Sequence, residues 1–268
     1  GIPTYFAADI AYHYNKLATR GFAKAIDVWG ADHHGHVARM KGAMDAIGLN
    51  GEDLDVVLMQ MVNLMRDGKP ARMSKRTGKA ITLTDLLDEV PIDSARFFFN
   101  QRESSSTLDF DLDLAVRNDS ENPVYYLQYA HARICSVFAQ AQEKGIEVPS
   151  VEEMASEDLS SLTAPTELRL MSKLSDFPTA LANGTEDLSP LALVTYLKEL
   201  AADFHSFYNA ERVLVDDEKL RNARLALLVA TRQVLRNGLE ILGVSAPERL
   251  SRADQPADST KYCLLYTS

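Results

Sequence analysis

Cysteine is scarce in this sequence. Only Cys135 and Cys263 occur among 268 residues, which is too few for a disulfide framework or a cysteine-based zinc site, so a reducing compartment fits. Long apolar runs are lacking as well, since no stretch approaches the roughly 18 residues that a membrane helix needs. The first residues also lack the charged-then-apolar order of a signal peptide. We therefore expect a cytoplasmic protein without a membrane segment.

Positive charge is in short supply. The chain has 28 Lys and Arg against 38 Asp and Glu, a net charge of -10. This balance argues against indiscriminate binding of nucleic acids, whose nonspecific affinity comes chiefly from neutralised phosphates, but it does not exclude a local basic surface. With 46% hydrophobic residues, the chain can bury the core of one large domain or of two ordinary ones.

A basic loop follows the apolar run that ends at Met65. Its sequence is Arg72-Met73-Ser74-Lys75-Arg76-Thr77-Gly78-Lys79. Clustered cations, a hydroxyl group and a flexible glycine suit a mobile loop that clamps the phosphates of a bound nucleotide. Basic turns are common and mostly have no such role, so a solvated turn is the alternative.

Residues 25–47 read as strand, glycine-rich turn and helix. Ala25–Trp29 predicts a short buried strand, and Val37–Ile47 predicts a helix that Gly48 could cap. This is the unit from which parallel doubly wound sheets are built, with ligands at the carboxyl ends of the strands. The turn between the two elements contains Asp32, His33, His34 and His36. These side chains could bind a metal, but the spacing matches no known zinc motif, and a polar rim around a nucleotide is favoured.

A possible cation site precedes that unit. Tyr5 and Asp9 are four residues apart and share one face of a helix expected over Phe6–Leu17. A carboxylate beside a phenol can take a guanidinium through charge-assisted hydrogen bonds and ring contact. Surface decoration is the alternative.

The remaining chain predicts one strand and then mostly helices. Val56–Met65 reads as a single buried strand, Thr84 and Asp93 as helix caps, and residues 108–114 as an alternating strand edge. Further helices are expected over 122–142, 166–183, 190–208 and 218–242, which predicts a helix bundle. The first of these contains Tyr125, Tyr126, Tyr129, His131 and Arg133, side chains that suit stacking on unpaired bases and binding phosphates, although aromatic residues at helical spacing are usually core.

The basic loop resembles the KMSKS signature loop of class I aminoacyl-tRNA synthetases. Met73, Ser74 and Lys75 stand in its central positions, whereas Arg72 replaces the first Lys and Arg76 the last Ser, a departure similar to arginyl-tRNA synthetases. Three further stretches resemble that family. They are the Tyr-x-x-x-Asp arginine site at 5–10, the adenosine site at 28–40, and the first and last helices of the DALR anticodon-binding domain at 124–133 and 230–243.

The resemblance implies a fold and an activity. It identifies the chain as the C-terminal portion of a bacterial-type arginyl-tRNA synthetase, an α/β plus all-α protein. Residues 1–119 would form the C-terminal half of a Rossmann-like catalytic domain with its connector, and 120–250 the helical DALR domain. The implied reaction is ATP-dependent activation of L-arginine, with Mg²⁺ bound alongside the ATP, and its transfer to the 3′-terminal adenosine of arginine tRNA. We expect a monomer.

The resemblance also implies residue roles. Lys75 and Ser74 would be catalytic, and Tyr5 and Asp9 would bind arginine. ATP would be bordered by Gly30, Asp32, His33, His36, Met73, Ser74 and Lys75. Arginine tRNA would be contacted by Tyr125, Tyr129 and Arg133.

The ends of the chain suggest a fragment. The sequence begins at Gly1 already in patterned sequence, and the family's HIGH motif, which holds the ATP phosphates, is missing. We therefore expect the fragment alone to be inactive, and the alternative function is a tRNA-binding module without catalysis. Residues 251–268 are expected to be non-native, because Cys263–Ser268 resembles the translation of a transposon sequencing adapter.

Overall fold

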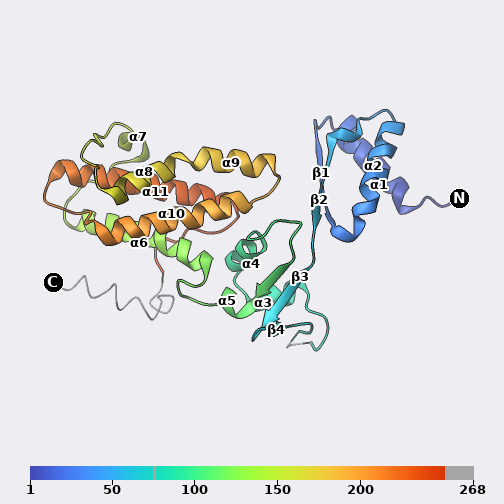
Figure 1. Ribbon diagram of the computed structural model, residues 1–268, viewed down its shortest axis with the longest axis horizontal. Coiled ribbons are helices and arrows are strands. Elements are labelled where there is room, and N and C mark those ends of the chain that lie inside the picture. The colour runs from blue at the N-terminus through green and yellow to red at the C-terminus, as the bar shows by residue number, and fades with distance from the viewer. Residues whose placement is uncertain (75–76, 251–268) are drawn as a thin grey trace. The chain divides into compact units, whose positions relative to one another are not determined.

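The computed structural model describes residues 1–74 and 77–250. Lys75, Arg76 and the tail 251–268 lie outside the described residues. The chain forms two compact units, which we call unit 1 (Gly1–Asn63 with Arg102–Asp109) and unit 2 (Leu64–Gln101 with Phe110–Ser268) (Figure 1). Contacts thus group residues 64–101 with the helical part of the chain, whereas the sequence suggests a division at residue 119; the domain ranges stay a prediction.

Unit 1 is a strand–helix–strand unit with one further helix on the same side. Helix α1 (Tyr5–Tyr14) continues as a π-helical turn, η1 (Asn15–Thr19). Strand β1 (Ala25–Gly30) leads through the 3₁₀ turn η2 (Ala31–His33) into α2 (His34–Ala46). Strand β2 (Leu54–Met59), preceded by the 3₁₀ turn η3 (Gly51–Asp53), lies parallel to β1, from the pair Ala25–Leu54 to the pair Gly30–Met59.

The predicted strand and helix of this unit are confirmed, and so is the cap. Gly48 has a φ of +84°, a conformation that costs glycine little. Its N–H donates to the carbonyl of Asp45, and the N–H of Leu49 donates to that of Met44, which is the pattern of a Schellman cap. The core beneath the helices consists of Ala25, Met40, Met44 and Leu54, with Phe6, Ile10 and Trp29 packed against it.

The single strand predicted over Val56–Met65 is wrong. The chain leaves the first sheet after β2 and starts a second sheet at β3 (Val62–Arg66), which pairs with β4 (Lys69–Pro70) and lies between β4 and β5 (Leu108–Asp111). Apolar periodicity gave no sign of this break, because both halves are apolar. The predicted turn is confirmed: Asp67 and Gly68 have φ of 52° and 70°, as a two-residue hairpin turn needs.

Two caps and one strand of the connector differ from expectation. Helix α3 (Leu83–Glu89) is capped by Thr82 rather than Thr84, because the hydroxyl of Thr82 and the carboxylate of Asp85 form a capping box. Helix α4 (Ile92–Phe99) begins after Pro91, and Asp93 is inside it. The alternating run ends early, since the Asp111 carboxylate accepts from two backbone N–H groups and starts the short helix α5 (Leu112–Ala115).

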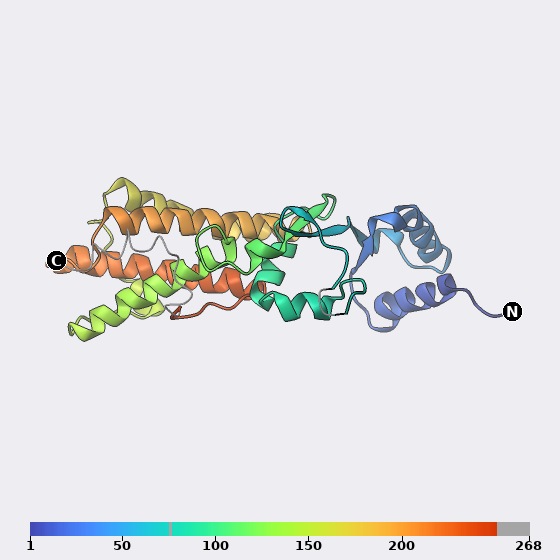
Figure 2. The same ribbon diagram turned by 90° about the horizontal axis from the view of Figure 1, so that it is seen from below.

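The predicted helix bundle is confirmed in unit 2. Helix α6 (Pro123–Glu143) starts with Asn122 as its cap, and α10 (Leu191–Ala210) and α11 (Glu218–Ile241) are its long neighbours (Figure 2). The predicted helix 166–183 is two helices, α8 (Pro165–Ser175) and α9 (Phe177–Glu186), and the Pro-bearing stretch before them contains α7 (Val151–Met154).

Inside the bundle lies a closed ionic cluster. Arg224 is 6% exposed and Glu167 is 1% exposed. The guanidinium donates to Glu167 over 2.9 Å, to Glu211 over 2.7 Å and to the carbonyl of Arg212 over 2.6 Å. Because a buried ion is costly unless it is paired and hydrogen-bonded, this cluster fixes α8 against α11.

Candidate functional site

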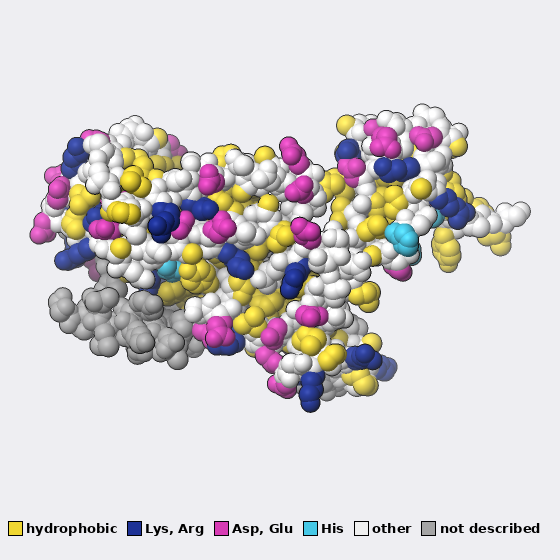
Figure 3. Space-filling view, in the orientation of Figure 1, with side chains coloured by type: hydrophobic (Ala, Val, Ile, Leu, Met, Phe, Trp, Pro, Cys, Tyr) yellow, Lys and Arg dark blue, Asp and Glu magenta, His cyan; other side chains and the backbone are white. Residues whose placement is uncertain are grey.

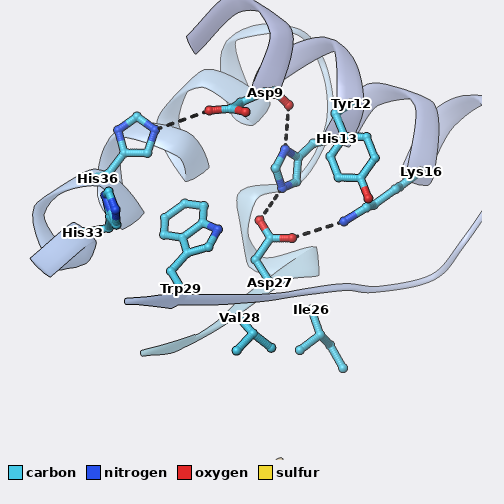
Figure 4. Close-up of a pocket in the computed structure, with 10 residues that line it drawn as sticks. All are labelled: Asp9, Tyr12, His13, Lys16, Ile26, Asp27, Val28, Trp29, His33 and His36. Carbon is cyan, nitrogen blue, oxygen red and sulfur yellow. Dashed lines mark hydrogen bonds and ion pairs between the residues drawn. The ribbon is translucent and has the colours of Figure 1, made fainter. Parts of the chain in front are cut away.

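A cavity of about 450 Å³ lies in unit 1, between α1, the strand β1 and the turn that follows it. Figure 4 shows its polar lining, with side chains of α1 and η1 above the strand and His33 and His36 at one end. The lining residues are Asp9, Tyr12, His13, Lys16, Ile26, Asp27, Val28, Trp29, His33 and His36. The cavity therefore sits beside the carboxyl end of β1, where doubly wound sheets bind ligands.

The predicted arginine pair is only half inside this cavity. The Asp9 side chain lines it, is 51% exposed, and has its Oδ2 4.0 Å from Nε2 of His36. Tyr5 is 93% exposed and is not among the lining residues. The open carboxylate of Asp9 can take a cation by charge-assisted hydrogen bonds, and the contribution of Tyr5 stays a prediction.

Three of the predicted ATP-binding side chains lie on the turn after β1 and on the first turn of α2. A Cβ at Gly30 would lie 2.5 Å from the Asp32 Oδ1 atom, so the glycine leaves room for that carboxylate. Asp32 and His33 are 81% and 62% exposed. His36 is held between two rings, with centroids 5.3 Å from Phe6 and 5.5 Å from Trp29.

The turn after β1 is the place where the sequence leaves a metal site open as the alternative to a nucleotide. Among the described residues, no group of three or more His, Cys, Asp or Glu side chains is arranged to hold an ion. His34 lies outside the cavity lining and approaches the Ala31 carbonyl at 3.3 Å on the exposed side. His33 and His36 instead border the cavity from one end.

Sequence reasoning missed a buried polar cluster on the cavity wall. His13 and Asp27 are 3% and 8% exposed, and the His13 Nε2 atom lies 2.5 Å from the Asp27 Oδ2 atom. Lys16 donates to the other oxygen over 3.1 Å. The signal was present: Asp27 is an ionisable residue within a predicted buried strand, and such a group needs a partner.

The signature loop folds back on itself in unit 2. Met73 pairs with Ala80, the Ser74 N–H donates to the Lys79 carbonyl over 2.7 Å, and the Gly78 N–H donates to the Ser74 carbonyl over 2.9 Å. Met73 is 61% exposed and Ser74 only 4%. Lys75 lies outside the described residues. The loop belongs to unit 2 and the cavity to unit 1, so the expectation that both border ATP stays a prediction.

The predicted tRNA contacts form a packed aromatic group on α6 and α10. The Arg133 guanidinium lies over the rings of Tyr129 and Tyr208, 4.7 and 4.2 Å from their centroids, and donates to the Tyr129 hydroxyl over 2.8 Å. Tyr125 is 5% exposed, so its ring is part of the bundle interior. Sequence reasoning missed Tyr208 and His205, because their partners are on another helix.

His131 is not on the surface. It is fully buried, its Nδ1–H donates to the Pro247 carbonyl over 2.8 Å, and its Nε2 accepts from the Arg236 Nε–H over 2.8 Å. Burial is the main reason that the pKa of His131 lies below its ordinary value, and the charge of Arg236 adds to it. His131 therefore holds the segment after α11 against the bundle, and its ring is enclosed by protein atoms.

Comparison with known proteins decides the family. Residues 127–250 match the model of the DALR anticodon binding domain. The chain is 56% identical to the arginine–tRNA ligase of Ruminiclostridium cellulolyticum over 250 residues, which are 93% of this chain and 44% of that protein. It matches a solved structure from Campylobacter jejuni, provisionally named arginyl-tRNA synthetase, with a TM-score of 0.81, 36% identity, and coverage of 93% of this chain and 53% of that one.

The chain belongs to the arginyl-tRNA synthetase family. The Thermus thermophilus arginyl-tRNA synthetase shares the fold, with a TM-score of 0.77 and 24% identity over 93% of this chain and 50% of that one. The chain spans less than half the length of the curated relatives that it matches. In the part of the chain that the structure describes, no helix is long and apolar enough to cross a membrane.

Proposed function

We propose that this chain is part of an arginine–tRNA ligase, which activates L-arginine with ATP and transfers it to the 3′-terminal adenosine of arginine tRNA. The observation that supports this most directly is the half-exposed carboxylate of Asp9 at the mouth of a polar cavity, in a chain of the arginyl-tRNA synthetase family. The proposed setting is the cytoplasm, and the proposed state is a monomer.

Arginine selection follows from the charges around the cavity. The carboxylate of Asp27 is engaged by His13 and Lys16, so Asp9 is the lining carboxylate with oxygen atoms still available to a substrate. A guanidinium can donate two parallel hydrogen bonds to one carboxylate. Tyr5, four residues earlier on α1, is proposed to close over the guanidinium when arginine binds.

ATP is proposed to bind beside the turn after β1. Gly30 allows close approach of the nucleotide, while Asp32, His33 and His36 offer hydrogen bonds or ring contact to its base and ribose. Mg²⁺ is proposed to enter with the ATP, since it prefers phosphate and water oxygens with one or two carboxylates. Lys75, Ser74 and the Met73 backbone are assigned to the phosphates by resemblance to the family's loop.

The chemistry then has two steps. A carboxylate oxygen of arginine attacks the α-phosphorus of ATP, and the bond to pyrophosphate breaks, leaving arginyl-adenylate. A ribose hydroxyl of the terminal tRNA adenosine next attacks the arginyl carbonyl carbon and loses its proton, and AMP leaves. In-line displacement needs placement and neutralised charge more than covalent catalysis by the protein.

The bundle is proposed to bind the anticodon arm of arginine tRNA. Its match to the DALR model supports this, and the Tyr129–Arg133–Tyr208 group offers ring faces and a held cation. On the bundle face seen in Figure 3, basic and acidic side chains are interspersed. Stacking and local contacts are therefore expected to matter more than a broad basic surface.

Amino-acid-dependent exchange between ATP and pyrophosphate in the full-length enzyme tests the proposal. Exchange is expected with arginine and not with lysine or ornithine. Lys75→Ala should lower the exchange rate by about 100-fold or more, as expected for a group that neutralises transition-state charge, without a change in melting temperature. Exchange that is independent of arginine would contradict the proposal, and an unchanged rate would remove Lys75 from its role.

A second candidate, a tRNA-binding module without catalysis, is favoured by one observation. The alignment with the first relative covers 93% of this chain but only 44% of that protein, whereas the DALR match at 127–250 extends from near the start of α6 to beyond the end of α11. This chain alone is expected to bind arginine tRNA weakly, with affinity that falls as salt rises. Measurable arginine-dependent exchange by this chain alone would contradict the second candidate.

A further inference from the structure

The cavity wall contains a polar cluster, His13, Lys16 and Asp27, that no part of the proposed reaction uses. Asp27 lies in the middle of β1, opposite Val56 of β2. It is 8% exposed. An unpaired buried carboxylate would cost several kcal/mol, yet a small apolar residue would fit a strand at no such cost. A specific role would explain why Asp27 occupies this buried position, and the hydrogen bonds of the cluster indicate that role.

His13 connects Asp27 to the turn of α1 that carries Asp9. Its Nδ1 lies 2.6 Å from the backbone carbonyl oxygen of Asp9, which only accepts, so Nδ1 carries a proton and donates. Its Nε2 faces the Asp27 carboxylate at 2.5 Å, and a second proton lies between those two atoms. Both sides of the ring are thus occupied, and the ring cannot rotate without breaking a buried hydrogen bond.

Lys16 completes the cluster from the next turn. Its Nζ donates to the Asp27 Oδ1 atom over 3.1 Å and lies 4.2 Å from the Tyr12 ring centroid. The two oxygens of Asp27 are therefore each engaged, whereas among the described residues the Asp9 carboxylate pairs only with His36, at 4.0 Å. Figure 4 shows this asymmetry, with dashed lines on both Asp27 oxygens.

We propose that His13 and Asp27, assisted by Lys16, are positioning residues for Asp9. They tie the Asp9 turn of α1 to the middle of β1, so that the free carboxylate is held at the cavity while the buried one is withheld from the substrate. This inference rests on the proposed arginine activation. Because Asp9 is proposed to bind the guanidinium by charge-assisted hydrogen bonds and not to touch the reacting carboxylate, a loosened α1 should weaken arginine binding more than the chemical step.

The test uses arginine-dependent ATP–pyrophosphate exchange by the full-length enzyme. His13→Ala should raise the KM for arginine by about tenfold or more, with kcat and the KM for ATP within about twofold; tenfold corresponds to about 1.4 kcal/mol. Asp27→Asn, which keeps the side-chain volume, and Lys16→Met should raise the KM for arginine by smaller factors. His34→Ala, an exposed histidine outside the cavity lining, is the matched control and should change neither KM.

The outcomes separate the two proposals. If the unchanged enzyme shows no arginine-dependent exchange, the proposed function fails. If it is active but His13→Ala and Asp27→Asn leave the KM for arginine unchanged, or raise both KM values equally, the positioning role fails. Should His13→Ala not fold, Asp27→Asn and Lys16→Met decide by the same criterion. In this chain, the His13 ring protons should also exchange slowly with water by NMR, and rapid exchange of both would contradict the hydrogen bonds.

Discussion

The cavity of unit 1 and the interior of the helical bundle both contain charged residues, but they differ in how completely those residues are paired. In the bundle, Arg224 is surrounded by acceptors from Glu167, Glu211 and Arg212. In the cavity, Asp27 is equally enclosed, yet Asp9 on the same wall keeps an open carboxylate. A polar cluster whose hydrogen bonds are all made within the protein contributes to the fold, whereas a carboxylate with unused hydrogen-bonding capacity beside a cavity indicates a ligand-binding site.

The bundle cluster should give the largest effect on stability. Arg224→Ala leaves the buried Glu167 carboxylate without its cation, and we expect the free energy of unfolding to fall by about 3–5 kcal/mol. Urea denaturation followed by circular dichroism would measure this. Lys219→Ala, which breaks the exposed 3.0 Å pair with Asp158, should cost far less, because exposed ion pairs contribute little to stability. If both variants lost the same free energy of unfolding, burial would not determine how much an ion pair contributes to stability.

Acid should destabilise the bundle through its buried histidines. Burial, with the charge of Arg133, lowers the pKa of His205 to about 3, and burial lowers the pKa of His131. The unfolded chain binds these protons near the ordinary value of 6.5, so it holds more protons than the folded chain below that pH. Stability is fully present above pH 6.5 and is lost as the pH falls toward the folded pKa values, by up to about 1.4 kcal/mol per pH unit for each histidine.

His205→Phe tests that slope. The variant keeps a ring against Tyr126 and removes one titrating group, so its free energy of unfolding should depend less steeply on pH between about 6 and 4. His34→Gln, on the exposed side of unit 1, serves as the control and should keep the original slope. A slope that is identical in His205→Phe would exclude His205 as a source of acid sensitivity.

The same small substitution should act oppositely in the two units. An added Cβ at Gly238 of α11 would lie 2.5 Å from a Leu197 methyl carbon, whereas one at Gly42 of α2 meets nothing within 4 Å. Gly238→Ala should therefore cost about 1–3 kcal/mol of stability by overpacking. Gly42→Ala should stabilise its helix by up to about 1 kcal/mol. Thermal unfolding of both variants would measure the difference, and a stabilised Gly238→Ala would contradict the close contact of α10 and α11.

Much of the fold follows from sequence patterns that are local. The cap by Gly48, the hairpin at Asp67 and Gly68, and the start of α6 at Asn122 each depend on a few neighbouring residues. The break between β2 and β3 leaves no trace in the pattern, because apolar character continues through it. The cap of α3 is Thr82 and not the predicted Thr84, since a threonine two residues away can serve the same helix start. Local patterns fix an element's type better than its ends.

The site was less predictable because its key contacts join distant residues. Asp9 could be found from its helical spacing and the family resemblance, and it lines the cavity. The His13–Asp27 pair could not be placed, since the two residues are 14 apart and meet only when α1 packs on β1. His131 shows the reverse case. Its aromatic neighbours in the sequence suggest a surface that stacks on bases, but its side chain is buried by contacts with Arg236 and Pro247, which come from the far end of the chain.

The most direct test of the account is the arginine dependence of ATP–pyrophosphate exchange in the full-length Asp9→Asn variant. Asp9 is half exposed and, within the described residues, forms no buried ion pair, so the asparagine variant should fold normally. We expect the KM for arginine to rise by about 30-fold or more, because a charge-assisted bidentate pair is lost, while the KM for ATP stays within about twofold. An unchanged KM for arginine would contradict the claim that the unit 1 cavity selects the guanidinium.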